Sequence, residues 1–101
     1  MLKKSERLPH QFLMHPKGRR VSFRFGSAVL LSPPARGIAV VASKKVFGGA
    51  VSRNRVRRRV YAALRKVPID ISERGVIVYP SAIALTASFA DLAEALGRVF
   101  S

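Results

Sequence analysis

Side chains that can bind phosphate are concentrated in the middle of this chain. Residues 52–61 read SRNRVRRRVY, so five arginines fall within seven residues from Arg53 to Arg59. Lys44 and Lys45 precede this run, and the Gly48-Gly49 pair lies between the two groups. The guanidinium group is a planar donor that can contact two phosphate oxygens at once. These residues therefore predict binding to a phosphate-rich polyanion.

Groups that could support catalysis by the chain itself are scarce. A metal-dependent nuclease needs several carboxylates that converge on Mg²⁺. The five acidic residues are Glu6, Asp70, Glu73, Asp91 and Glu94. They are spread over the chain, and His10 and His15 are more simply interpreted as exposed side chains than as metal ligands. Gly48-Gly49 does not fit a Walker loop, because no Gly-Lys-Ser/Thr follows. We expect no catalytic residue and no metal site made by the protein.

The overall charge supports a nucleic-acid partner. The formal net charge is +14 on 101 residues, and between Arg7 and Ile69 there is no acidic residue but fifteen of the nineteen lysines and arginines. The hydrophobic fraction of 49% indicates a folded domain and not a disordered basic tail. Nucleic acid is favoured over an anionic membrane surface, since so high a charge density suits phosphates. No protein partner is expected.

Cysteine usage and hydropathy bear on the compartment. The chain has no cysteine, which fits a reducing cytoplasm and excludes disulfides and thiolate metal sites. Near the N-terminus there is no apolar run of signal-peptide length. The longest clean apolar runs have the length of strands, far below the ~20 residues of a membrane span. We expect a cytoplasmic protein with a single domain over residues 1–101.

Four segments are expected to be strands. Residues 21–25 alternate strictly, which would place Val21, Phe23 and Phe25 on one face. Gly26 and Ser27 then permit a bend before the short run 28–31. The β-branched run 38–42 and the apolar run 76–79 suit buried strands. A turn rich in proline and glycine separates residues 31 and 38.

A basic amphipathic helix is expected from about Ala50 to Lys66, ended by Pro68. On a helical wheel one arc is apolar, and its members are Val56, Val60, Ala63, Leu64 and Val67. The opposite side carries Asn54, Arg55, Arg58, Arg65 and Lys66, with Arg53 and Arg57 beside the apolar edge. Because the helix has no acidic residue for i,i+4 pairing, its arginines repel each other unless phosphates lie against them. We expect this face to contact RNA or DNA.

A second helix is expected after Ser88, whose hydroxyl can cap the backbone N–H of Asp91. Apolar residues then recur at helical spacing to the end of the chain. At most one short helix fits between Pro9 and Pro16. Three strands, the basic helix, one strand and a last helix make an α+β protein arranged as a two-layer α/β sandwich.

The aromatic residues Phe12, Phe23 and Phe25 allow two interpretations. Aromatic side chains on one strand face usually belong to a core. In a basic domain they can instead line a groove in which unpaired bases stack. The sequence leaves both open.

The run from Ser43-Lys44-Lys45 to the Arg-Asn-Arg of residues 53–55 resembles the protein subunit of bacterial ribonuclease P. Weaker similarity extends to Arg7-Leu8, to the basic turn at 17–20, to the strand at 75–80 and to the helix start at 88–92. The resemblance implies the order αβββαβα with a left-handed βαβ crossover, as in domain 2 of ribosomal protein S5.

The resemblance also implies a function. In this family a large RNA cleaves precursor tRNA at the mature 5′ end. The protein docks on that RNA, helps it to hold Mg²⁺ and binds the 5′ leader in a cleft. By motif position the RNA contacts are Lys44, Lys45, Arg53, Asn54, Arg55, Arg57 and Arg58. The chain would then be an accessory subunit of an endoribonuclease, with the chemistry left to the RNA.

Three departures from the family pattern stand out. The N-terminal segment is short and offers Phe12 where the family has two aromatics, so Phe23 and Phe25 are candidate replacements in a leader-binding cleft. Arg59 falls where the family tends to be apolar, and Tyr61 where it tends to be basic. Other classes remain: another small basic RNA-binding protein, such as a ribosomal protein, or a protein-only nuclease, which the scarcity of acids disfavours.

Overall fold

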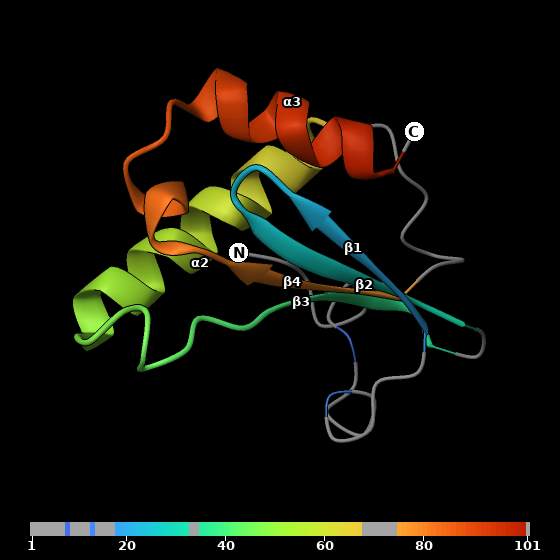
Figure 1. Cartoon of the computed structure of the whole chain (residues 1–101), viewed down its shortest axis with the longest axis horizontal. Coiled ribbons are helices and arrows are strands. Elements are labelled where there is room, and N and C mark those ends of the chain that lie inside the picture. The colour runs from blue at the N-terminus through green and yellow to red at the C-terminus, as the bar shows by residue number, and fades with distance from the viewer. Residues whose placement is uncertain (1–7, 9–12, 14–17, 33–34, 68–74, 101) are drawn as a thin grey trace.

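The part of the chain that the structure describes folds into a four-stranded mixed sheet and two α-helices (Figure 1). The computed structural model describes residues 8, 13, 18–32, 35–67 and 75–100. Its elements are β1 (Gly18–Phe23), β2 (Gly26–Leu31), β3 (Gly37–Val40), α2 (Ala50–Arg65), β4 (Gly75–Pro80), the 3₁₀ helix η2 (Ala82–Leu85) and α3 (Phe89–Val99). This order of strands and helices confirms the prediction. The predicted helix between Pro9 and Pro16 lies outside the described residues, apart from Leu13.

The strands lie in the order β1-β2-β4-β3. β2 pairs antiparallel with both β1 and β4, whereas β3 pairs parallel with β4. Val76, Ile77 and Val78 of β4 are completely buried, because side chains pack against both faces of this inner strand. Burial on both faces explains why the sequence of β4 is a continuous apolar run. The edge strand β1 has solvent beside it and can therefore contain charged residues.

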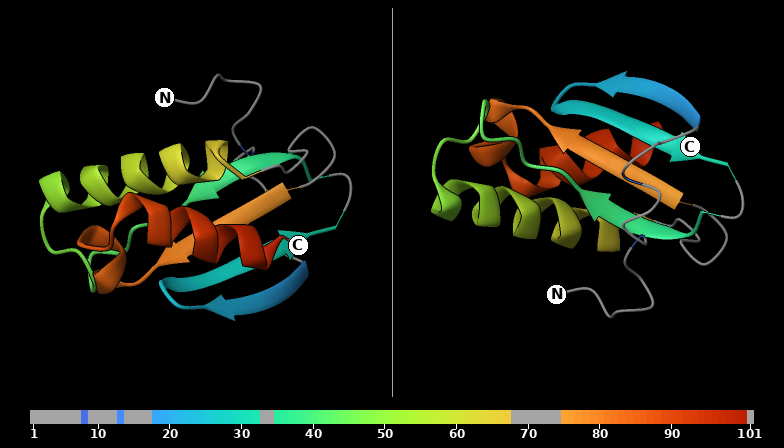
Figure 2. Two further views of the ribbon diagram at one scale, coloured as in Figure 1. Left: turned by 90° about the horizontal axis from the view of Figure 1, so that it is seen from above. Right: turned by 90° about the horizontal axis from the view of Figure 1, so that it is seen from below.

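The main core lies between one sheet face and the helices. Both α2 and α3 lie on the same side of the sheet (Figures 1 and 2). The fully buried side chains there include Val56 and Val60 of α2 and Leu92 and Leu96 of α3. A smaller cluster covers the opposite sheet face and consists of Leu8, Val29, Leu31, Ala35, Ala39 and Ile77.

The turn between β1 and β2 differs from the prediction of a strand over residues 21–25. β1 starts earlier, at Gly18, and ends at Phe23, so Arg24 and Phe25 form a two-residue turn. Gly26 has a φ of 145°, and a Cβ on it would lie 2.2 Å from the carbonyl oxygen of Tyr79. The close approach of β4 therefore fixes where β2 begins, which no local alternation could indicate.

The helices agree with their predicted positions. α2 ends at Arg65, one residue before the predicted end, and all five residues of its predicted apolar arc are buried. At the start of α3 the backbone N–H of Asp91 donates to Ser88 Oγ at 3.1 Å, which confirms that cap. The 3₁₀ helix η2 was not predicted. It follows β4 directly and buries Ala84 in the core.

Two glycine substitutions test the turn. Gly26→Ala should lower the free energy of unfolding by at least about 2 kcal/mol, because alanine is strained at this φ and its Cβ meets the β4 backbone. Gly97→Ala is the matched control: it lies within α3, where an added Cβ meets nothing within 4 Å. It should raise stability by about 0.5–1 kcal/mol. Urea unfolding gives the free energy of unfolding of both variants. Equal changes in the two would contradict the close approach of β4 to Gly26.

A basic helix face as candidate nucleic-acid interface

The burial of one side of α2 determines which of its basic residues reach solvent. Val56, Val60, Ala63 and Leu64 are at most 2% exposed. The opposite side is left to solvent, and its exposed residues are Asn54, Arg55, Arg58, Arg65 and Lys66. Arg53 and Arg57, beside the apolar edge, are half-buried. The predicted division of the helix into a core face and a charged face is thus confirmed.

The lysine pair lies in the turn that leads from β3 toward α2. Lys44 and Lys45 are both exposed. Ser43 holds this turn: its carbonyl oxygen accepts from the backbone N–H of Phe47 at 2.9 Å, and its hydroxyl accepts from that of Val46 at 3.3 Å. The Phe47 side chain is buried in the main core and anchors the loop. The turn at Ser43 and the buried Phe47 side chain therefore hold the loop so that the ammonium groups of both lysines reach solvent.

Arg53 connects that loop to the helix. Its Nη1 donates to the carbonyl oxygens of Phe47 at 3.3 Å and Gly48 at 3.4 Å. The N-cap residue of α2 is Gly49, which has no side chain to cap the helix, and the first turn contains no acidic residue. The guanidinium of Arg53 thus fixes the position of the lysine loop relative to the exposed arginines. This positioning role was not foreseen from the sequence.

Asn54 has a comparable role within the helix. Its Oδ1 accepts a hydrogen bond from Nη1 of Arg57 at 3.1 Å, across one helical turn. An amide at this position can orient a neighbouring guanidinium without neutralising it, which a carboxylate would do. Arg55 and Arg58, in contrast, form no hydrogen bond or ion pair with any other described residue.

Arg59 acts inside the protein. Its Nε donates to the carbonyl oxygen of Ala84 at 3.3 Å, and its Nη2 donates to that of Ala87. These bonds link α2 to the segment from η2 to α3. The five arginines therefore do not all depend on an external anion for a partner, since Arg53 and Arg59 each donate to two backbone carbonyls. The sequence gave no sign of this, because the acceptors are main-chain atoms some 25 residues away.

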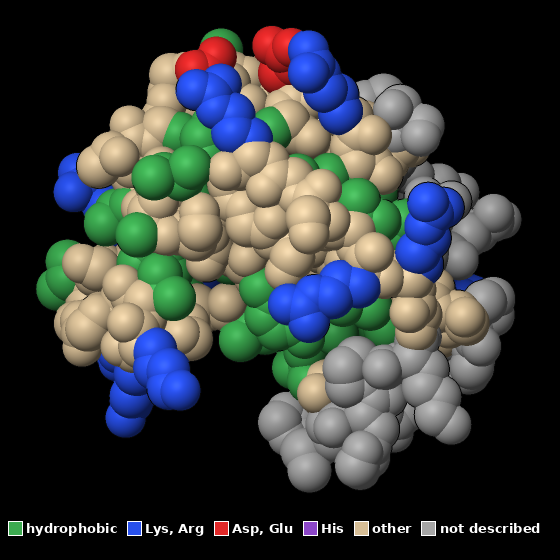
Figure 3. All heavy atoms as spheres, viewed as in Figure 1, with side chains coloured by type: hydrophobic (Ala, Val, Ile, Leu, Met, Phe, Trp, Pro, Cys, Tyr) green, Lys and Arg blue, Asp and Glu red, His purple; other side chains and the backbone are tan. Residues whose placement is uncertain are grey.

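The negative charge of the described residues is confined to α3. Asp91 and Glu94 both lie there, and Glu94 pairs with Arg98 at 2.7 Å. On the face drawn in Figure 3 the acidic side chains gather over α3, whereas lysines and arginines occur over the whole face. Within the described ranges no three His, Cys, Asp or Glu side chains gather where they could hold a metal ion. A polyanion approaching α2 thus meets no acidic residue on that helix.

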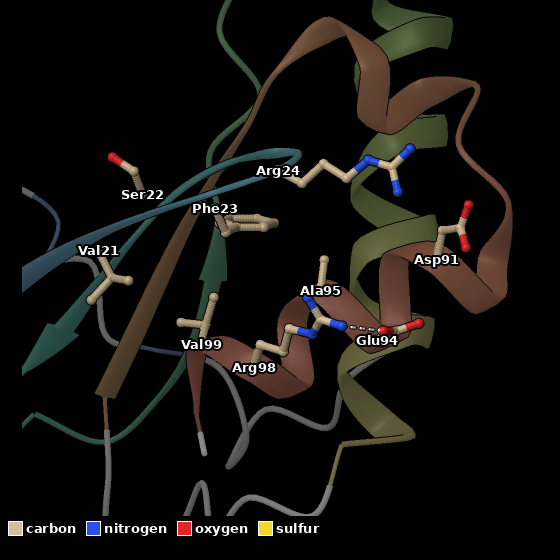
Figure 4. Close-up of a pocket in the computed structure, with 9 residues that line it drawn as sticks. All are labelled: Val21, Ser22, Phe23, Arg24, Asp91, Glu94, Ala95, Arg98 and Val99. Carbon is tan, nitrogen blue, oxygen red and sulfur yellow. Dashed lines mark hydrogen bonds and ion pairs between the residues drawn. The ribbon is translucent and has the colours of Figure 1, made fainter.

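The aromatic residues have different environments. Phe25 is 3% exposed and belongs to the main core, so its ring is not available for a base. Phe23 is half-buried and points from β1 toward α3, where it lines a pocket of about 350 Å³ with Arg24, Asp91 and Glu94 (Figure 4). The core interpretation therefore holds for Phe25. Phe12 lies outside the described residues.

Tyr79 lies on the sheet face opposite the helices, and sequence analysis did not select it. Its ring packs half-buried against the smaller apolar cluster, and the guanidinium carbon of Arg20 lies 5.9 Å from the ring centroid. Nη2 of Arg20 also donates to Ser27 Oγ at 3.3 Å. The alternation of residues 76–79 could have indicated that Tyr79 faces away from Val76 and toward this side.

These features define a class of protein: a small α+β domain in which a sheet supports one basic helix face suited to a polyanion. No helix among the described residues is long and apolar enough to span a membrane. The sequence matches the family described as Ribonuclease P over residues 2–101. The chain belongs to this family, as its protein component.

A relative of known sequence agrees with this assignment, and solved structures agree with the fold. The ribonuclease P protein component of Thermus aquaticus is 37% identical over 82 residues, a match that covers 81% of this chain but 49% of that protein. The chain thus aligns with about half of this relative's length. A mutant of the Staphylococcus aureus RNase P protein superposes with a TM-score of 0.76 at 21% identity, covering 96% of this chain and 86% of that one. The RNase P protein of Thermotoga maritima gives 0.72 at 20% identity, with 93% and 94% covered.

Two matched arginine-to-methionine substitutions separate the internal arginine from an exposed one. Arg59→Met should lower the free energy of unfolding by about 1–2 kcal/mol, because the carbonyls of Ala84 and Ala87 lose a charged donor. Arg58→Met should stay within about 0.5 kcal/mol. Both variants remove one positive charge from the same helix, so the change in net charge is the same in each. Thermal and urea unfolding without RNA measure the difference, and equal stabilities would refute the structural role of Arg59.

Proposed function

We propose that this chain is the protein subunit of ribonuclease P. As a single domain it binds the catalytic RNA and assists removal of the 5′ leader from precursor tRNA. Family membership supports the assignment. The observation that carries it is the basic unit in which Arg53 of the Arg-Asn-Arg helix donates to two carbonyl oxygens of the loop that carries the lysine pair. Such a unit presents several cations at fixed spacing to a folded phosphate backbone.

The RNA contacts divide into two kinds in this proposal. Lys44, Lys45, Arg55 and Arg58 are exposed and contact phosphate directly. Arg53, Asn54 and Arg57 take part in internal hydrogen bonds, so they position the surface as well as contact RNA. The guanidinium groups of Arg53 and Arg57 each retain further N–H donors for phosphate.

The reaction itself is left to the RNA. Ribonuclease P chemistry implies Mg²⁺, but the described residues do not form a site for it, since no three acidic or histidine side chains gather there. We assign the metal to the RNA subunit and its substrate. The contribution of the protein is charge neutralisation, which lets RNA strands approach each other with fewer free cations. This role requires many lysines and arginines and no carboxylate cluster.

The sheet face around Tyr79 is the better candidate for the leader. It offers a half-buried aromatic ring with Arg20 beside it, and Ser27 next to both. A base can stack on such a ring while the guanidinium contacts its phosphate. Phe25 is excluded by its burial, and Phe23 faces α3 instead of this surface. Tyr79 therefore replaces both as the aromatic residue proposed to contact the leader.

The finer features implied by the family belong to the same proposal. β3 and β4 are parallel neighbours joined through α2, as a left-handed crossover of the ribosomal protein S5 domain 2 type requires. The order begins with an N-terminal helix in that fold. A role in tRNA maturation places the protein in the cytoplasm, where precursor tRNA is processed.

Reconstitution tests the function directly. The chain is combined with a bacterial ribonuclease P RNA and precursor tRNA at a Mg²⁺ concentration where the RNA alone is slow. We expect 5′ cleavage to be restored, because the added cations offset phosphate repulsion. Binding without rescue for every bacterial RNA tried would favour another basic RNA-binding protein, such as a ribosomal protein. Cleavage by the protein alone would indicate a nuclease.

The salt dependence of RNA binding tests the exposed arginine. Arg55→Ala should weaken binding to the catalytic RNA and reduce the slope of log K against log salt by about one, as expected for one lost phosphate contact. Gly97→Ala on α3 is the control and should leave the slope unchanged. An unaltered slope for Arg55→Ala would show that this side chain does not contact phosphate.

A further inference from the structure

The charged face of α2 contains a hollow with an aromatic wall. Asn54, Arg57, Arg58 and Tyr61 line a pocket of about 420 Å³. These positions are spaced i, i+3, i+4 and i+7, so they form one stripe along the helix. The volume lies within the usual range for small-molecule sites. An amide, two guanidinium groups and one aromatic ring thus line one side of a hollow that is open to solvent.

Tyr61 is held in place from below. It is half-buried and packs against the main core, so its ring has already lost much of its rotational freedom. Stacking on a ring that is already ordered costs little additional entropy. The other three residues that line the pocket have polar or charged side chains, so Tyr61 supplies its aromatic ring.

The polar groups beside Tyr61 are arranged for a nucleotide. The Oδ1 of Asn54 is engaged by Arg57, which leaves the amide N–H₂ of Asn54 as a donor to an acceptor atom on a base edge. Arg58 has no partner among the described residues, so its guanidinium is available to a phosphate. An isolated inorganic anion would be served by the arginines alone and would leave the ring unused. A base attached to a phosphate uses every group that lines the pocket.

We propose that this pocket binds one unpaired nucleotide of RNA, whose base stacks on Tyr61 while its phosphate contacts Arg57 and Arg58. The site deepens the proposed function, since it places a base contact within the helix that docks on RNA. It is distinct from the surface at Tyr79, which lies on the opposite face of the sheet from α2. Docking would then depend on an extruded base as well as on charge.

Two probes of equal length separate the base from the phosphate. One is a fluorescently labelled oligoadenylate, and the other is an abasic ribose-phosphate oligomer with the same label. Tyr61→Leu should weaken oligoadenylate binding about tenfold, the loss typical of one stacked base, and leave abasic binding unchanged. Tyr61→Phe keeps a stacking ring and should bind both probes like the parent chain. Fluorescence anisotropy at several salt concentrations gives the affinities and slopes.

The salt slope gives an independent readout. Tyr61→Leu should keep the parent slope on oligoadenylate, because no phosphate contact is lost, whereas Arg58→Ala should reduce the slope by about one on both probes. An equal loss on both probes for Tyr61→Leu, or no loss on either, overturns the proposal. Melting temperatures of the variants are compared first, and binding is measured only for variants that melt at the parent temperature, so that a folding defect is recognised before either probe is added.

A spectroscopic experiment avoids truncating the ring. The chain has two tyrosines, Tyr61 and Tyr79. In a Tyr79→Phe chain labelled with 3-fluorotyrosine, the single ¹⁹F resonance comes from Tyr61. It should shift on addition of oligoadenylate and remain in place with the abasic oligomer. Equal shifts with both overturn the stacked base. Failure of the reconstitution assay with a retained base-specific shift would refute the ribonuclease P assignment and leave this site standing.

Discussion

Burial of the apolar stripe of α2 is the constraint on which the rest of the structure depends. Val56 and Val60 are at most 1% exposed, and their packing against the sheet fixes the rotation of the helix about its axis. Once that rotation is fixed, Arg55 and Arg58 must point to solvent, and Arg59 must lie beside η2 and α3. The free energy of apolar burial therefore holds like charges together that would otherwise separate.

The protein relieves part of this repulsion with its own atoms. Arg53 and Arg59 are directed to main-chain carbonyls, and Arg57 to an amide oxygen. A carbonyl oxygen carries only a partial negative charge within a neutral group, so it cannot neutralise the guanidinium that donates to it, and the net positive charge remains available to a partner. Acidic residues would have formed stronger internal pairs with these arginines, but they would also have weakened the attraction of α2 for a polyanion. Among the described residues the acidic side chains lie only in α3, where they leave the charge of α2 unopposed.

Sequence reasoning succeeded where the information is local. The wheel of α2, its end near Pro68, the cap at Ser88 and the order of strands follow from spacing and residue type, and the structure confirms them. It failed where a segment distant in sequence determines the local structure or the partner of a side chain. The turn at Arg24-Phe25 depends on the approach of β4, and the role of Arg59 depends on carbonyls after η2. Tyr79 was missed because the alternation of residues 76–79 indicates its sheet face but not that this face leaves the ring partly exposed.

The position of β4 has a consequence for how the chain folds. β4 lies between β2 and β3, yet it follows them in sequence after the whole of α2. The β1–β2 hairpin can form early from local contacts, but β3 has no strand partner, and the stripe of α2 has no complete sheet to cover, until residues 75–80 are in place. Contacts so far apart in sequence slow folding. During synthesis the basic segment therefore leaves the ribosome before β4, and the sheet against which its helix packs can be completed only once residues 75–80 have been made.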